Sequence, residues 1–213
     1  MPLEHNRNLT DAGNPAKPAG KAGEDMLLYM NKEHKDLTLW ALDIFERGAG
    51  DRILDIGCGG GETIRVLSER IPTGHFTGID HSEVSVKLSG ETNASSIREG
   101  RTEILSGSVS ELPFEDGSFD RIITVESFYF WPDPPESLKE VYRVLTKGGR
   151  FFLVSEIYER PDLTGRSRSN IEKYKMNVPG IGEFKELFRE AGFSDTEIHL
   201  KDGEYWIVVE GIK

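Results

Sequence analysis

The chain has 213 residues, of which 37% are hydrophobic, enough to fill one substantial core. Its 26 Lys and Arg against 37 Asp and Glu give a net charge of −11, which repels a phosphate backbone, and no basic patch offsets it. No apolar run approaches the roughly 20 residues that span a bilayer, and residues 1–14 lack the apolar core of a signal peptide. One cysteine, Cys58, excludes an internal disulfide. We expect a soluble, cytoplasmic protein with no nucleic-acid or membrane partner, and the sequence predicts no oligomeric state.

The first quarter of the chain predicts a mobile tail followed by helices. Residues 11–25 are small, polar and rich in Pro and Gly, so residues 1–24 are expected to form a flexible tail or a lid. Apolar side chains then recur at spacings of three and four, which predicts helices at about 25–31 and 35–47.

From Arg52 onward, strand-like and helix-like segments alternate. This alternation favours parallel strands joined by helical crossovers. The predicted strands cover residues 52–56, 75–80, 103–106, 120–125 and 150–155, and the predicted helices cover residues 62–70, 83–98 and 134–145.

The end of the chain departs from this alternation. Helices are predicted at about 168–175 and 181–191, followed by strand-like runs at 196–200 and 205–210. The dipeptide Asp202-Gly203 between these runs is a strong hairpin signal. The sheet is therefore expected to end in an antiparallel pair.

The segment after the first strand carries the chemistry. Gly57, Gly59 and Gly61 join that strand to its helix, at the edge where open α/β sheets bind ligands. Glycine allows tight turns and close approach of the backbone to a ligand, so a nucleotide-like ligand is expected here. A dinucleotide fingerprint needs a small residue at position 62, where Glu62 stands, and its carboxylate would repel a pyrophosphate.

Asp80 ends the second predicted strand. A carboxylate at this place can accept hydrogen bonds from both ribose hydroxyls. Asp80 therefore indicates a ribose, but it does not distinguish NAD from other adenosine ligands. The alternative is that Asp80 only caps the next helix, although Ser82 can also make that cap.

Residues 50–156 resemble the class I S-adenosylmethionine-dependent methyltransferases. The resemblance rests on the glycine segment that begins at Asp55, on Asp80, on residues 106–120 and on residues 138–149. It implies a doubly wound α/β fold with a seven-stranded, mostly parallel sheet in the order 3-2-1-4-5-7-6 and an antiparallel terminal hairpin. It also implies one domain over residues 25–213, made of helices at 25–47, the cofactor-binding core at 50–156 and a C-terminal part at 157–213.

The same resemblance implies S-adenosyl-L-methionine as cofactor. Ser108 stands where the family usually has an acid that accepts the adenine amino group, and a hydroxyl can replace it less strongly. The implied cofactor contacts are Asp55, Gly57, Cys58, Gly59, Gly61, Asp80, His81, Ser108, Val109 and Glu126.

The acceptor side is predicted at two places. Tyr129 and Trp131 follow the fourth strand and are expected to wall a pocket, while Met30 and His34 lie in a segment that closes over the cofactor in part of the family. His34 and Tyr129 are the candidate catalytic residues, against the plainer interpretation that such side chains only pack. His75, His81 and His199 have no partner at ligand spacing, so no metal is expected.

These observations predict in-line methyl transfer to a small-molecule acceptor. Two alternatives stay open: an NAD(P)-dependent oxidoreductase, disfavoured by Glu62 and the terminal hairpin, and a module that binds S-adenosylmethionine without catalysis.

Overall fold

The computed structural model describes residues 13–45 and 51–213, and its strands form one seven-stranded sheet in the order β3-β2-β1-β4-β5-β7-β6. The pairs β1–β2, β2–β3 and β4–β5 are parallel, whereas β5–β7 and β6–β7 are antiparallel. The predicted fold class, strand order and terminal hairpin are therefore confirmed. None of the helices in the described residues combines the length and apolar character needed to cross a membrane.

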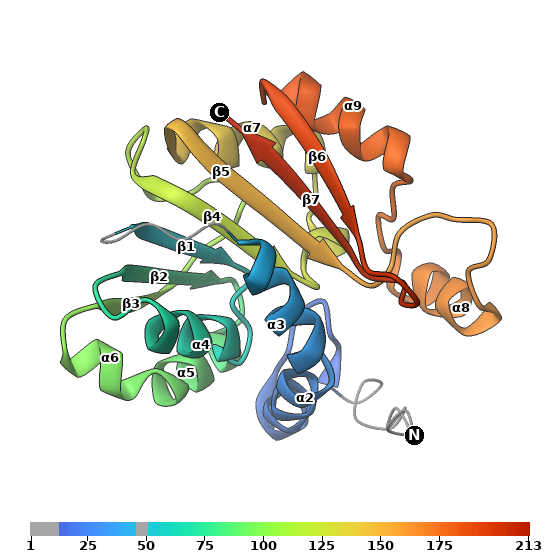
Figure 1. The fold of residues 1–213 in the computed structure, drawn as a ribbon. Helices are drawn as coiled ribbons and strands as arrows, with labels where there is room; N and C mark the ends of the chain where they lie inside the picture. Colours follow the sequence, from blue (N-terminus) through green and yellow to red (C-terminus); the bar gives the residue numbers. More distant parts are fainter. Residues whose placement is uncertain (1–12, 46–50) are drawn as a thin grey trace. The chain divides into compact units, whose positions relative to one another are not determined.

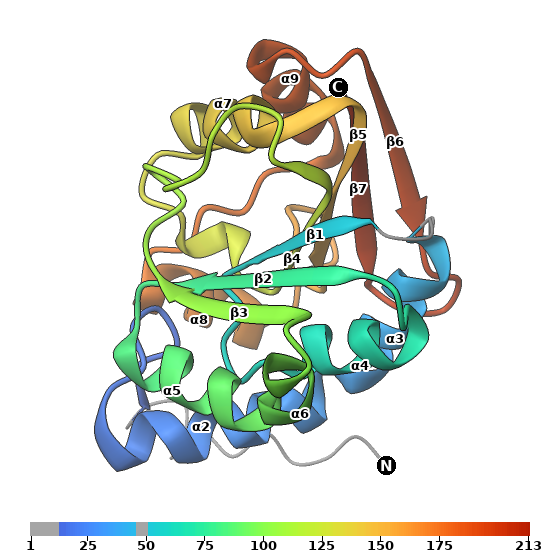
Figure 2. The ribbon, with the colours of Figure 1, turned by 90° about the vertical axis from the view of Figure 1, so that its left-hand side faces the viewer.

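The chain divides into two compact units, Met1–Ser108 and Val109–Lys213. In the first unit, α4 and α5 pack on one side of the strands, and α2 packs against α5 (Figures 1 and 2). Its elements are α2 (Gly20–Glu33), α3 (Lys35–Ile44), β1 (Arg52–Ile56), α4 (Glu62–Arg70), β2 (His75–Asp80), α5 (Glu83–Thr92), α6 (Ala94–Arg98) and β3 (Thr102–Ser106).

In the second unit, α7 and α9 pack together beside the terminal strands (Figure 2). Phe151, Phe188 and Phe193 fill this layer, with ring centroids 5.0–6.1 Å apart. The elements are β4 (Phe119–Val125), η1 (Phe128–Phe130), α7 (Pro134–Val144), β5 (Leu145–Ser155), α8 (Gly165–Tyr174), α9 (Ile181–Ala191), β6 (Asp195–Leu200) and β7 (Ile207–Ile212).

The N-terminal helix is longer than predicted. It begins at Gly20 instead of near residue 25. Gly23 lies inside this helix and allows the chain to pack closely against it, since a Cβ there would lie 2.9 Å from the Pro18 carbonyl carbon. Pro18 is itself buried, so part of the predicted tail is packed structure. Residues 1–12 and 46–50 lie outside the described residues. They include residues 1–12 of the predicted tail and residues 46–47 of the predicted helix.

Two further helix and strand boundaries differ from the prediction. The predicted helix over 83–98 is broken at Asn93, whose side-chain amide donates to the Gly61 carbonyl at 2.9 Å. The fifth strand begins at Leu145 instead of residue 150, because Leu145 pairs with Phe119 of β4 ahead of a register shift; Gly148, with a φ of 76°, lies within the strand. The remaining elements match the prediction to within about three residues.

Gly211 of β7 packs closely against the aromatic layer. A Cβ at this position would lie 2.7 Å from ring atoms of Phe188 and Phe193. We expect Gly211→Ala to lower the free energy of unfolding by about 1–3 kcal/mol, as overpacking does. Gly182 of α9 has open space around it, so Gly182→Ala should raise the same quantity by about 0.5 kcal/mol. Urea unfolding measures both, and equal stability of the two variants would contradict this packing.

Candidate active site

The glycine loop of the first unit joins β1 to α4 and is fixed by backbone hydrogen bonds. Gly57 and Cys58 donate to the Ile79 carbonyl at 2.8 and 3.2 Å, which ties the loop to the neighbouring strand. Gly57, Gly59 and Gly61 have φ values of 73°, 51° and 81°, a region that disfavours any side chain. The loop therefore needs glycine at these three predicted positions.

The three later glycines of the loop differ in the space around them. A Cβ at Gly60 would meet the Asn31 side chain at 2.4 Å, and one at Gly61 would meet Asn93 and Ser89 at 2.6 Å. At Gly59 the nearest atom is Leu27 Cδ2 at 3.6 Å, an ordinary contact distance. Gly59 is thus the place in the loop where another group can approach the backbone closely.

Asp80 lies at the end of β2 and orients this loop. One carboxylate oxygen accepts from the Gly59 N–H at 3.0 Å, and the other accepts from the Ser82 N–H at 2.9 Å. Ser82 makes the cap of α5 by accepting from the Ser85 N–H at 3.3 Å. Each Asp80 oxygen has a second lone pair for a further donor. Neighbouring His81 is half exposed, and its Nδ1 lies 4.0 Å from an Asp80 oxygen.

Asp55, at the end of β1, is 2% exposed, and its Oδ2 has no hydrogen-bond partner among the described residues. Burial, together with the charge of Asp80, raises the pKa of Asp55 to about 8. Burial likewise raises the pKa of the Cys58 thiol well above its usual value. A ligand that brings a positive charge and hydroxyl donors would satisfy both carboxyl groups.

The N-terminal segment contacts the same loop. The Asn31 side-chain amide donates to the Gly60 carbonyl at 3.3 Å, and Ser82 Oγ donates to the Pro18 carbonyl at 2.6 Å. Sequence reasoning missed Asn31 and Asn93 as loop contacts, although Asn31 stands in the segment that carries Met30 and His34. Met30 and His34 are half-buried, and His34 lies at the junction of α2 and α3.

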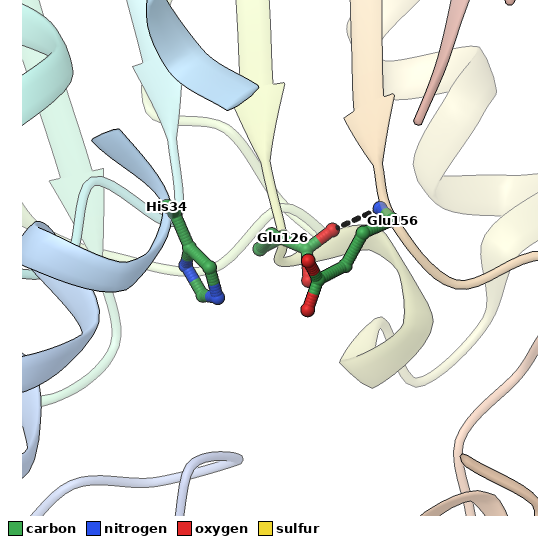
Figure 3. A group of neighbouring side chains, drawn as sticks. All are labelled: His34, Glu126 and Glu156. Carbon is green, nitrogen blue, oxygen red and sulfur yellow. Dashed lines mark hydrogen bonds between the residues drawn. The ribbon is translucent and has the colours of Figure 1, made fainter. Parts of the chain in front are cut away.

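In the second unit, Glu126 follows β4 and is 6% exposed. Its φ of 53° is unusual for a residue other than glycine. One carboxylate oxygen accepts from the Glu156 backbone N–H at 2.6 Å, as Figure 3 shows. The other oxygen accepts from the Tyr129 hydroxyl at 2.9 Å.

Burial raises the pKa of Glu126 to about 7, and the hydrogen bonds from Glu156 and Tyr129 oppose that rise. Burial also raises the pKa of Tyr129 well above its usual value, so this hydroxyl remains a donor. Glu126 can therefore exchange a proton near neutral pH.

The other predicted site residues occupy different surroundings. Trp131 is 6% exposed, and its ring lies 5.1 Å from Phe128 and 6.3 Å from Phe151, so it belongs to the aromatic core. Ser108 is exposed after β3, and Val109 is buried.

The prediction that His199 lacks a partner is wrong. Its Nε2 lies 2.9 Å from Glu210 Oε2, because the β6–β7 register pairs Glu197 with Glu210 and so places Glu210 diagonally opposite His199. Arg150 binds the other Glu210 oxygen, so this acid is already paired, and the absence of a metal stays a prediction.

Comparison with known proteins agrees with this geometry. The methyltransferase domain family matches residues 54–153. A demethylmenaquinone methyltransferase of Staphylococcus aureus is 32% identical over 179 residues, covering 72% of each chain. A chloroplastic 2-methyl-6-phytyl-1,4-hydroquinone methyltransferase of Oryza sativa is 30% identical over 170 residues, which are 80% of this chain and 46% of that protein.

A solved structure of similar fold is the Haemonchus contortus phosphoethanolamine N-methyltransferase 2 with phosphomonomethylethanolamine and S-adenosylhomocysteine. It has a TM-score of 0.78 at 15% identity and covers 97% of this chain and 59% of that chain. The chain belongs to the class I S-adenosylmethionine-dependent methyltransferases. It is an enzyme that transfers a methyl group from S-adenosyl-L-methionine.

The raised pKa of Asp55 gives a stability test. Folding takes up a proton at pH values between the ordinary pKa of an aspartate and about 8, so stability falls as the pH rises through this window. We expect Asp55→Asn to gain stability over the wild type between pH 5 and pH 9, by more than about 1.4 kcal/mol.

Glu103→Gln is the matched control, because Glu103 is an exposed acid of β3 in the same unit. Chemical unfolding at several pH values provides the measurement. A stability difference between wild type and Asp55→Asn that does not change with pH would contradict the buried, protonated carboxyl.

Proposed function

We propose that this methyltransferase acts on a small acceptor with a hydroxylated aromatic ring, and that Glu126 takes the hydroxyl proton. The observation that carries the proposal is a buried carboxyl with a pKa near 7, held by Tyr129 and the Glu156 N–H. The names of the two relatives, which give demethylmenaquinone and a hydroquinone, support an acceptor of this type.

The cofactor is proposed to bind at the glycine loop of the first unit. Asp80 would accept hydrogen bonds from the ribose hydroxyls, and Asp55 would face a positive group of the ligand. The orphaned Asp55 oxygen and the open approach at Gly59 fit this assignment. Cys58, His81, Ser108 and Val109 stay predicted cofactor contacts, whereas Glu126, also predicted as a cofactor contact, is proposed to face the acceptor. Met30 and His34 stay predicted contacts of the acceptor. A cytoplasmic location also stays a prediction.

The bound cofactor supplies a methyl group already activated by its sulfonium. In the proposed reaction, the cofactor would supply this methyl group to the hydroxyl oxygen of the acceptor, or to a ring carbon that the hydroxyl activates. The hydroxyl proton passes to the Glu126 carboxylate, so no further co-reactant is needed. Tyr129 holds the accepting oxygen in place and is a positioning residue.

The cofactor assignment is tested by calorimetric titration of Asp80→Ala with S-adenosylhomocysteine. Loss of two hydrogen bonds to a charged acceptor, each worth about 1.5–3 kcal/mol, should weaken binding at least tenfold. Glu103→Gln should bind as the wild type does, and NADH should not bind saturably to either. Unchanged affinity in Asp80→Ala would contradict the ribose assignment, and tight NADH binding would favour the oxidoreductase alternative.

The role of Glu126 is tested by the pH dependence of methyl transfer to naphthalene-1,4-diol. Because the carboxylate is the active form, kcat/KM should rise with pH to a plateau, with an apparent pKa of about 7. Tyr129→Phe removes a hydrogen bond that lowers this pKa, so its acidic limb should move to higher pH.

Glu126→Gln should lose this limb and most of kcat while binding S-adenosylhomocysteine. The dimethyl ether of the diol, which has no hydroxyl proton, serves as the substrate control. A wild-type pH profile retained by Glu126→Gln would contradict the proton transfer.

A further inference from the structure

Strand β6 forms an open edge of the sheet. Among the described strands it pairs with β7 alone, and Figure 1 shows it as the outermost strand of the second unit. Its register with β7 is continuous from Asp195 to Leu200, and it contains no proline. A continuous edge without proline presents unpaired N–H and C=O groups, to which a further strand can add.

The backbone of β6 directs alternate residues to this edge. Lys201, the next residue after β6, donates its N–H to the Trp206 carbonyl at 3.2 Å, so the ladder to β7 uses the odd-numbered residues of β6. The N–H and C=O groups of Thr196, Ile198 and Leu200 therefore face away from β7. The Thr196 N–H donates to a side chain of β6 itself, which agrees with this direction.

The side chains of these three residues share the face of the sheet that α9 covers. Thr196 stands opposite Gly211, and a Cβ at Gly211 would meet Phe188 of α9. Ile198 and Leu200 follow at alternate positions on the same face, and Leu200 is 50% exposed. A strand added at this edge would cover that apolar side chain.

The charges of β6 and of the residue after it are complementary to themselves. The sequence from Asp195 is Asp-Thr-Glu-Ile-His-Leu-Lys, with acids before Ile198 and basic side chains at the mirrored positions after it. In an antiparallel pair of two copies centred on Ile198, Asp195 lies opposite Lys201 of the partner subunit. Glu197 then lies opposite His199 of the partner subunit, so both acids meet basic side chains.

We propose that β6 is the interface with a second copy of this chain, whose β6 adds antiparallel across a two-fold axis at Ile198. This pairing places Thr196 opposite Leu200 of the partner subunit and brings the two Ile198 residues together. Each of the three residues then forms a hydrogen-bonded pair across the edge. Because a two-fold contact uses the same surface of both subunits, it ends at a dimer.

The backbone and the charges select the same register. A pairing centred on Glu197 would place its carboxylate against Glu197 of the partner subunit, which is repulsive. A pairing centred on His199 would leave Asp195 without a basic partner, and it would leave the edge groups of Thr196 without a strand residue opposite. The mirrored charges therefore favour a second copy of this chain over an unrelated strand.

The test measures the molar mass of the full chain by sedimentation equilibrium over a range of concentrations. The wild type should associate to a dimer and dissociate on dilution. Asp195→Lys and Lys201→Glu each place like charges at both ends of the interface, so each should weaken dimerisation by about tenfold or more. Glu111→Lys and Arg166→Glu make the same charge changes at exposed positions elsewhere in the second unit and should dimerise as the wild type does.

The sharpest measurement mixes the two interface variants. In a mixed pair, the introduced lysine of one chain faces the introduced glutamate of the other, and the unchanged Asp195 and Lys201 face each other. Asp195→Lys and Lys201→Glu should therefore form a heterodimer about as stable as the wild-type dimer, although each alone associates weakly. A chain that carries both substitutions should again dimerise with itself.

A backbone variant tests the edge directly. Ile198→Pro removes an N–H that faces the edge and leaves the ladder to β7 intact, so the chain should fold, as followed by circular dichroism, and be monomeric.

A wild type that stays monomeric at up to millimolar concentration would overturn the proposal. Dimerisation that both charge variants retain would overturn it as well. Failure of the mixed variants to associate would overturn the antiparallel register about Ile198, and growth of the wild type beyond a dimer would overturn the two-fold axis.

Discussion

Two carboxyl groups lie at the ends of adjacent parallel strands in the first unit, and the proposed cofactor site depends on them. Asp55 pairs with Gly78 in the β1–β2 register, and Asp80 stands two residues further along β2. Asp80 is held by two backbone N–H groups, whereas an oxygen of Asp55 has no partner and the charge of Asp80 disfavours its ionisation. Asp80 also accepts from the Gly59 N–H of the glycine loop, so the shape of the loop and the proposed preference for a positive ligand both depend on these carboxyl groups.

In the second unit, a buried carboxyl likewise lies at the end of a strand, where Glu126 follows β4. Glu126 is buried like Asp55, but its two oxygens accept hydrogen bonds from Glu156 and Tyr129, which limit the rise in its pKa. The pKa of about 7 suits proton exchange during turnover, whereas that of Asp55, about 8, suits a group that is neutral until a cation arrives. This difference in hydrogen bonding supports the different roles proposed for the two acids.

The features that depend on short sequence patterns could be predicted. The glycine segment, Asp80 and the Asp202-Gly203 turn each carry their signal within a few residues, and the strand order follows from the family resemblance. Contacts that join distant residues could not, because no local pattern encodes them. Asn93 on the Gly61 carbonyl and Tyr205 over Arg160 depend on packing. The sequence does not predict the early start of α2, because residues 11–25 are small, polar and rich in Pro and Gly, whereas in the structure the lack of a side chain at Gly23 lets Pro18 pack against the helix.

The central claim, that a protonated Asp55 awaits a positively charged cofactor, is tested most directly by the proton balance of binding. Calorimetric titration of S-adenosylmethionine at pH 7, in buffers of different ionisation enthalpy, counts the protons exchanged. The account predicts that a positive ligand lowers the pKa of Asp55, so that the wild type releases a substantial fraction of a proton on binding and Asp55→Asn releases none. Binding without proton release, or equal release by both proteins, would contradict it.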